Sequence, residues 1–338
     1  MIRLRALRAA LLSAALSSPF AAHAHHGVAG IGAAALEGPG APIESASSAV
    51  LSQGQTLLYG KLDHARFKTY DPDPTAPEGK FASYWMIGAG HGFTPWFSAY
   101  VFAPYHAKVD EAGGLDSRGW ADVSVLGQIG FKHEPGEGMK LLPANESLDD
   151  LEDWHFTVFF GGTLPTGNAN HRLADGRIDP GKAHGFGRNT WSLGLSATKA
   201  LRPGLTFNLE ASTLRFREYT YAKGHPDAQR VRFGPEDRLN LSLARRMHTD
   251  PDRRLRIDGV IEAQYLALGR DVEDGAGAAA TGGRMLYLVP GVRLYKDNLS
   301  LALGLKTPVW TRLNESADQQ GAEGKEKYRL LLSASLLF

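Results

Sequence analysis

Short segments in which apolar and polar residues alternate recur along most of the chain. The spacing is clearest in residues 191–198, 205–210, 239–244 and 299–306. Residues 328–338 carry an apolar residue at every second position and an aromatic residue at each end, Tyr328 and Phe338. Because successive side chains of a strand point to opposite faces, this alternation predicts strands with one apolar face. Such strands are typical of a membrane β-barrel, in which the apolar face contacts lipid.

The connections between these segments alternate in length. Tight turns are expected at residues 92–95, 202–204 and 296–298, with a longer one at 247–252. Long, polar, Gly-rich connections cover residues 71–80, 110–119, 167–187, 221–230, 271–283 and 314–325. The pattern predicts an all-β fold, a transmembrane antiparallel up-and-down β-barrel of about twelve strands over residues 54–338, with its tight turns on the periplasmic side. Residues 133–153 depart from this rule, because they are long and acidic where a tight turn is expected, and we interpret them as a short helix or flap.

The start of the chain has the composition of an export signal. Residues 1–8 are basic, residues 9–20 are mostly apolar, and Ala22-His23-Ala24 forms a small-residue cleavage site. We therefore expect residues 1–24 to be a signal peptide, removed on export. Elsewhere the chain has no run of 18 apolar residues, which excludes a helical membrane protein. The chain has no cysteine, so no disulfide framework holds the fold, and its net charge of +1 gives no reason to expect nucleic acid as a partner.

Residues 25–53, between the signal peptide and the first strand, have a composition of their own. They are rich in Ala, Gly and Ser, and their only acidic residues are Glu37 and Glu44. This segment is more apolar than a typical solvated tail. We interpret it as an N-terminal extension that enters the barrel as a plug, and the alternative is a disordered periplasmic leader.

The face of each strand opposite the apolar residues is expected to line the lumen. The candidates are Asp122, Ser124, Gln128, Lys132, Asn208, Glu210, Arg238, Asn240, Arg256, Asp258, Glu262 and Gln264. The set is polar and mixed in sign. One interpretation is that these groups pair across a narrow lumen and fill it, because buried charges need partners. The other is that some of them form a path for a small polar or amphipathic solute.

Several histidines and aromatic residues are candidates for chemistry or for anchoring. Cleavage after residue 24 would leave His25 at the new N-terminus, and its amino group and imidazole, with His26, could bind Cu²⁺ or a similar divalent metal. The alternative is that these histidines are incidental. We expect Trp85, Tyr100, His155 and Trp191 in the aromatic girdle at the membrane interface. The loop at 167–187 could bind lipopolysaccharide phosphates, fold into the barrel mouth or remain a solvated loop.

Four short motifs carry a resemblance to a known family. They are Leu164-Pro165-Thr166-Gly167, the strand at Gly194-Leu195-Ser196, residues 304–310 ending at Trp310, and Tyr328-Arg329 after a polar loop. In these motifs the chain resembles the outer-membrane family named "MetA-pathway of phenol degradation", over most of its length from residue 53 onward. The resemblance implies a monomeric barrel of roughly twelve strands that acts as a transporter. It does not imply that this chain handles phenol.

These observations favour an integral protein of the outer membrane that serves as a channel or transporter for small molecules, with aromatic or amphipathic solutes as candidates, by passive or facilitated diffusion. The alternatives are a copper-type metal-binding or uptake barrel that uses His25 and His26, and a sealed barrel with a structural or ligand-binding role. We expect no enzyme and no cofactor, because G-x-S-x-G, HExxH and Cys/His metal motifs are all missing from the sequence. The expected partners are the lipid bilayer, lipopolysaccharide, the outer-membrane assembly machinery and a small solute.

Overall fold

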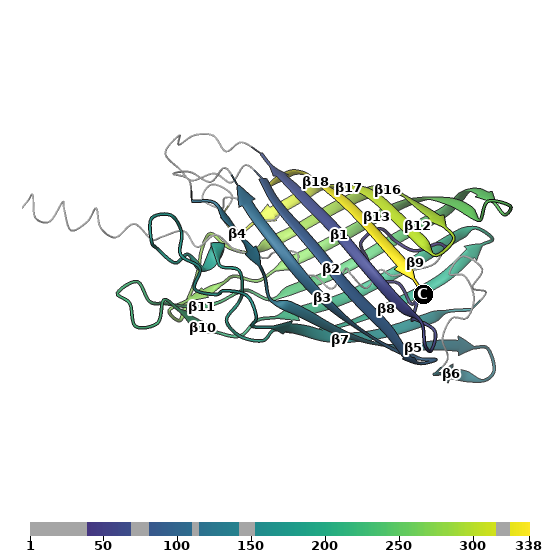
Figure 1. Ribbon diagram of the computed structural model, residues 1–338, viewed down its shortest axis with the longest axis horizontal. Helices are drawn as coiled ribbons and strands as arrows, with labels where there is room; N and C mark the ends of the chain where they lie inside the picture. The colour runs from purple at the N-terminus through teal and green to yellow at the C-terminus, as the bar shows by residue number, and fades with distance from the viewer. Residues whose placement is uncertain (1–38, 69–80, 110–114, 142–152, 316–324) are drawn as a thin grey trace, which may run out of the picture.

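Twelve long antiparallel strands form one closed barrel (Figure 1). The computed structural model describes residues 39–68, 81–109, 115–141, 153–315 and 325–338. In order around the wall, the strands are β1 (Thr56–Phe67), β2 (Phe81–Thr94), β3 (Phe97–Val109), β5 (Val123–Glu134), β7 (His155–Leu164), β8 (Trp191–Arg202), β9 (Leu205–Arg215), β12 (Glu236–Asp250), β13 (Leu255–Leu268), β16 (Gly283–Lys296), β17 (Leu299–Leu313) and β18 (Glu326–Leu337). Among the described residues, no helix has the length and apolar character needed to cross a membrane.

Each barrel strand pairs with its neighbours in sequence, so the topology is up-and-down. The last strand, β18, pairs antiparallel with β1 and closes the ring, and the two lie side by side in Figure 1. A short strand, β4 (Ser117–Trp120), continues the pairing with β3 beyond the outer end of β5. The prediction of an all-β, up-and-down barrel of about twelve strands is confirmed.

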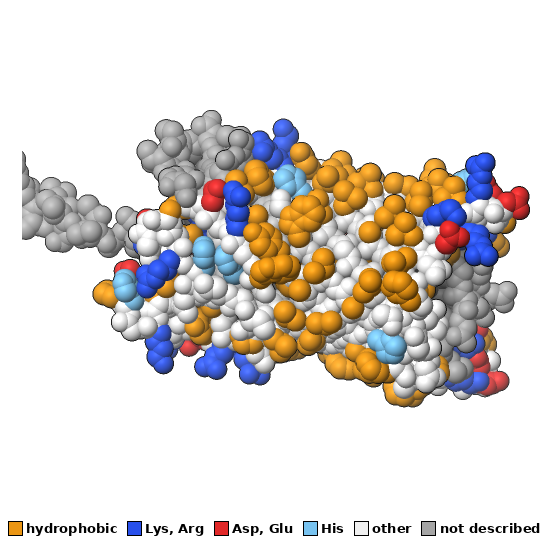
Figure 2. Space-filling model, viewed as in Figure 1, with side chains coloured by type: hydrophobic (Ala, Val, Ile, Leu, Met, Phe, Trp, Pro, Cys, Tyr) orange, Lys and Arg blue, Asp and Glu red, His pale blue; other side chains and the backbone are white. Residues whose placement is uncertain are grey.

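Alternation along each strand separates a lipid-facing surface from the lumen. In β17, Leu301 and Leu303 are 41% and 44% exposed, whereas Ala302 between them is 4% exposed. Figure 2 shows the resulting apolar belt across the middle of one face of the barrel, with charged side chains toward both ends. Closure of the ring leaves no unpaired strand edge in this belt, as the apolar interior of a bilayer requires.

Two of the four girdle residues expected from the sequence face the lumen instead. Trp85 and Trp191 are about half exposed on the outer wall, but Tyr100 and His155 are each only 4% exposed. Tyr100 lies on the same face of β3 as Phe102, which is also buried, while Val101 between them points outward. The interpretation of Tyr100 and His155 as interfacial anchors was therefore wrong.

The short turns lie together at one end of the barrel, which we take as the periplasmic end. Pro203 and Gly204 connect β8 to β9, and Gly204 has a φ of +71°, which favours glycine. At the same end, β5 continues into a hairpin with β6 (Gly138–Lys140). The described part of residues 133–153 is thus a β-hairpin and not a helix, and residues 142–152 lie outside the described residues.

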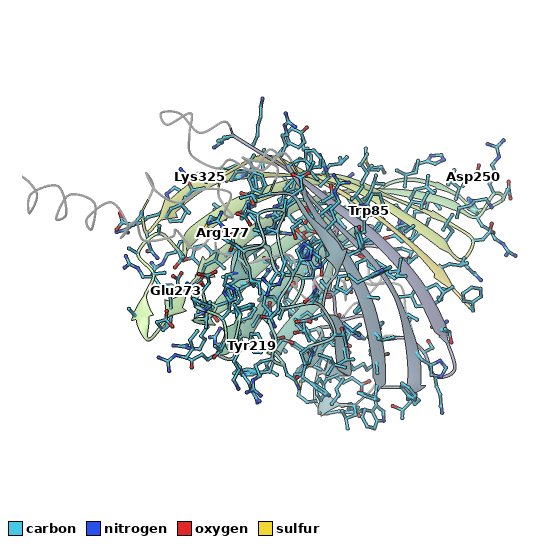
Figure 3. All side chains as sticks on the ribbon, turned by 60° about the vertical axis from the view of Figure 1, so that its left-hand side comes forward. Trp85, Arg177, Tyr219, Asp250, Glu273 and Lys325 are labelled. Atoms are coloured by element: carbon cyan, nitrogen blue, oxygen red, sulfur yellow. The ribbon has the colours of Figure 1, made fainter. Side chains whose placement is uncertain are left out.

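At the opposite, outer end the loops build additional structure. The strands β10 (Tyr219–Tyr221), β11 (Gln229–Arg232), β14 (Val272–Glu273) and β15 (Ala276–Gly277) form a small antiparallel sheet. The connection between β7 and β8 contains one 3-10 turn, η3 (Pro180–Lys182), and much of it is buried. Figure 3 shows Arg177, Tyr219 and Glu273 grouped at this end, far from Asp250 at the other.

Candidate functional site: the lumen, its inner segment and the outer mouth

Residues 39–55, here called the inner segment, run inside the barrel. Their backbone amides donate hydrogen bonds to carboxylates that project inward from the wall. Gly40 N lies 2.9 Å from Asp258 Oδ2, and Glu44 N lies 3.0 Å from Glu262 Oε1. Ala46 N lies 2.7 Å from Glu210 Oε2. Charged acceptors give stronger hydrogen bonds than neutral ones, so these carboxylates hold the segment along β9 and β13.

The second half of the inner segment continues across the lumen, from β8 beside β9 to β3. Ser48 N donates to Thr198 Oγ1 at 3.1 Å, on β8, and Leu51 N donates to Ser98 Oγ at 2.9 Å, on β3. Gly54 N then donates to the carbonyl of Gly92 at 2.8 Å, where the chain turns into β1. A segment that bonds to β3, β8, β9 and β13 reaches strands on different sides of the ring, and only an interior path allows this.

Glu44 is the one acidic side chain of the described inner segment, and it is held by two lysines. Its carboxylate lies 3.1 Å from Lys61 Nζ on β1 and 3.0 Å from Lys306 Nζ on β17. The three side chains are between 4% and 9% exposed. Isolated charges are costly to bury, so each group stabilises the buried position of the others.

Beside this ion cluster, the lumen wall from β1 to β7 is apolar and aromatic. The contacting residues are Leu57, Tyr59, Met86, Tyr100, Phe102, Leu126 and Phe159, with Ala46 and Leu51 of the inner segment packed on them. The rings of Tyr100 and Phe102 are stacked at 6.1 Å between centroids, and Tyr59 meets Phe102 edge-on at 6.1 Å. The lumen therefore has an aromatic side next to a charged side.

A group of uncharged polar side chains lies between these two sides. Gln128 of β5 is fully buried, and within the described part of the chain neither of its amide atoms has a hydrogen-bond partner. The same holds for the hydroxyl groups of Thr157 and Ser196, which are directly opposite each other on β7 and β8. Buried polar groups are normally hydrogen-bonded, so these three offer bonding positions to water or to a polar solute.

Most of the lumen candidates named from the sequence lie on the inner wall, where several are grouped. Asn208 and Glu210 bond to the backbone of Ala46, and Asn240 Nδ2 donates to Glu210 at 3.1 Å. Gln264 Nε2 donates to Glu262 at 2.7 Å. The remaining contacts of the set are Arg256 with Asp258 at 2.6 Å, Arg238 with Glu236 at 2.6 Å, and Lys132 with Glu134 at 2.6 Å.

Two candidates at the outer end are placed apart from this group. Asp122 accepts hydrogen bonds from the amides of Gly167 and Phe186, both at 2.8 Å, and so holds the β7–β8 connection. Ser124 is half-buried near the outer end of β5.

Two buried groups of charged residues were missed by sequence reasoning. Lys61 and Lys306 bind Glu44, and Arg329 lies 3.3 Å from Asp63 and 2.8 Å from Glu326. A lysine or arginine within an alternating strand was the available signal.

The β7–β8 connection folds back into the outer mouth. Lys182 and His184 are 3% and 6% exposed, and Ser117 Oγ of β4 donates to the carbonyl of Lys182 at 2.6 Å. His184 stacks on His171 at 4.1 Å between ring centroids and meets His106 of β3 edge-on at 4.9 Å. Burial, with the nearby His171, lowers the pKa of His184 to about 4, so it is neutral at pH 7. Within the described residues, no three His, Asp or Glu side chains are arranged to hold a metal ion.

The two histidines proposed as copper ligands, His25 and His26, lie outside the described residues, as does the expected signal peptide. Both therefore stay predictions.

The architecture just described, a closed antiparallel barrel of twelve long strands, is also found among solved outer-membrane proteins. It is similar to an outer-membrane channel from Pseudomonas putida F1, with a TM-score of 0.62 and 14% identity over 86% of this chain and 98% of that chain. The NanC porin overlaps at a TM-score of 0.43 with 8% identity, over 83% of this chain and 98% of its own. The β domain of the Bordetella autotransporter BrkA overlaps at 0.43 with 11% identity, over 85% of this chain and all of its own.

No family model and no curated protein matches the sequence. At 14% identity the likeness to the Pseudomonas channel concerns the fold alone. The chain therefore has the fold of an outer-membrane β-barrel, and the resemblance to the phenol-degradation family stays a prediction.

Proposed function

We propose that the protein is an outer-membrane channel for small amphipathic solutes and that the inner segment is its plug. The observation that carries this proposal is the path of residues 39–55 through the lumen, bonded to strands on several sides of the ring. A solute can pass at an appreciable rate only if this segment moves. Its contacts combine hydrogen bonds and one ion cluster with apolar packing of Ile43, Ala46 and Leu51 on the wall. A charged solute can compete for the ion cluster, and we infer that this competition makes docking reversible.

The composition of the lumen favours an aromatic carboxylate as the solute class. Tyr59 and Lys61 are two residues apart on the inner face of β1, so an aromatic surface lies beside a buried cation. An aromatic acid could pack on Tyr59 and Phe102 while its carboxylate bonds to Lys61. Glu44 now occupies that position, with Lys306 as its second partner.

This arrangement gives a physical route from binding to opening. A solute carboxylate that bonds to the two lysines competes with Glu44 for the same charges. Since a ligand shifts an equilibrium only by binding one state better, the solute favours the undocked plug. Gln128, Thr157 and Ser196 then offer hydrogen bonds to a polar substituent further along the wall.

The test is conductance of the refolded mature protein in a planar bilayer, with and without residues 28–50. We expect the deletion variant to pass a larger current, and benzoate to interrupt it more strongly than acetate or benzyl alcohol, which lack the ring and the carboxylate respectively. A folded deletion variant that passes no current would favour the sealed-barrel alternative. Equal effects of the three solutes would refute the solute class.

Hydrolysis of phospholipid or ester substrates by the purified barrel would contradict our expectation that it is not an enzyme.

A further inference from the structure

A row of outward-facing residues crosses four neighbouring strands at the outer rim of the barrel. Arg284 of β16 and Arg312 of β17 are direct partners in the sheet, and both side chains are exposed on the outer wall. Ala267 of β13 pairs with Arg284, and Asp237 of β12 pairs with Ala267. Like charges that face each other directly across two strands repel, so this arginine pair needs an anion nearby.

The carboxylate in this row already has other partners. Asp237 Oδ1 accepts from Arg215 at 2.8 Å and from Thr213 Oγ1 at 2.6 Å. Arg270, just after β13, is a third exposed arginine at the same rim. Among the described residues, no carboxylate lies within ion-pair distance of Arg270, Arg284 or Arg312. Within the part of the chain that the structure describes, these three cations thus have no carboxylate partner.

These arginines surround a groove of about 610 Å³ where the strands end. It is lined by Pro235, Asp237, residues 267–270, Gly283, Arg284, Arg312, Leu313 and Asn314. Directly next to the arginine pair, toward the apolar belt, Leu286 pairs with Trp310, and Trp310 is 46% exposed. An exposed tryptophan below a basic group is the usual order of side chains at the boundary between lipid tails and headgroups.

We propose that this groove binds a phosphate group of a phosphorylated glycolipid in the outer leaflet. Arg270, Arg284 and Arg312 surround the phosphate, and guanidinium groups suit it because their planar donors bond phosphate oxygens in pairs. The acyl chains of the lipid lie against Trp310 and the apolar belt. The groove faces outward, so this site is separate from the lumen and does not depend on the proposed channel function.

The experiment measures retention of lipid by the purified barrel in native mass spectrometry. The probes are diphosphoryl lipid A and the same lipid with both phosphates removed. The test variant is Arg284→Gln/Arg312→Gln. The matched control is Arg245→Gln/Arg253→Gln, which removes two exposed arginines near the periplasmic end. Both variants should keep the barrel fold, checked by heat-modifiable gel mobility, because all four side chains are exposed or partly exposed at the rims.

We expect the test variant to bind diphosphoryl lipid A roughly tenfold or more weakly than wild type, the scale of losing two charge-assisted contacts, with the control unchanged. The dephosphorylated lipid should bind all three proteins equally weakly. Equal losses in the test variant and the control would overturn the proposal, since the effect would be one of overall charge. Full competition by inorganic phosphate at the same concentration would also overturn it, because the site would then recognise free phosphate rather than lipid.

Discussion

Replacing Glu44 by glutamine should release the inner segment from the lumen. The substitution keeps the shape of the side chain but removes the charge that lies 3.1 Å from Lys61 and 3.0 Å from Lys306. Both ammonium groups would then be left buried without their carboxylate. Breaking a buried ion pair from one side costs about 3–5 kcal/mol, and we take about 3 kcal/mol because water can enter a lumen from its ends. That value corresponds to a roughly hundredfold shift of the docking equilibrium toward the undocked plug.

The assay is single-channel recording in planar bilayers, with the open probability as the readout. Glu134→Gln is the matched control, because Glu134 forms ion pairs with lysines at the periplasmic end but is well removed from the plug. The triple variant Glu44→Gln/Lys61→Met/Lys306→Met should have an open probability closer to that of wild type. All three charges of the ion cluster are then removed together, so none of them is left buried without its partner. An open probability of folded Glu44→Gln equal to that of wild type and control would refute the reasoning.

Three further predictions concern pH and metal. His184 has a pKa below its ordinary value of 6.5, so its protonation favours the state in which the loop has left the mouth. The folded β7–β8 connection should therefore lose stability as pH drops from 6.5 toward 4. A spin label at Ala174→Cys should become more mobile over that range. Burial and nearby aspartates raise the pKa of Glu273 to about 7, so the outer sheet should loosen as pH rises from 4.5 to 7, and Glu273→Gln should remove that change from the spectrum of a label in β15. Calorimetry on the processed protein should show Cu²⁺ binding that is lost when His25 and His26 are both replaced by Ala; equal binding by the variant would exclude this site.

The barrel could be predicted from the sequence because lipid imposes one simple rule on every strand. Leu301, Leu303 and Leu305 all face lipid, so their spacing is visible without knowledge of any partner strand. The same rule failed in β3, where Tyr100 and Phe102 face an aromatic part of the lumen and Val101 faces lipid. When both faces are apolar, alternation disappears and the sequence no longer tells which face points inward.

The site and the outer loops depend on contacts between residues far apart in the chain. The composition around Glu44 indicated a plug, but its pairing with Lys61 and Lys306 depends on the register of β1 and β17. Residues 271–283 were predicted only as a long, polar, Gly-rich connection, yet β14 within them pairs with β11 in a separate sheet. Lys182 is buried with its Nζ 3.5 Å from the carbonyl of Leu115 and its own carbonyl bonded to Ser117, and no local pattern in a polar loop reveals these contacts.

The most direct test of the plug is to fasten it reversibly to the wall. The chain has no cysteine of its own, so Ser48→Cys and Thr198→Cys introduce a single possible disulfide. The amide of Ser48 already donates to the side chain of Thr198 at 3.1 Å. The account predicts that the oxidised protein, with the crosslink verified on a gel, passes almost no current and that reductant restores it. An equal, benzoate-sensitive current before and after reduction would contradict the account, because solute would then pass without movement of residues 39–55.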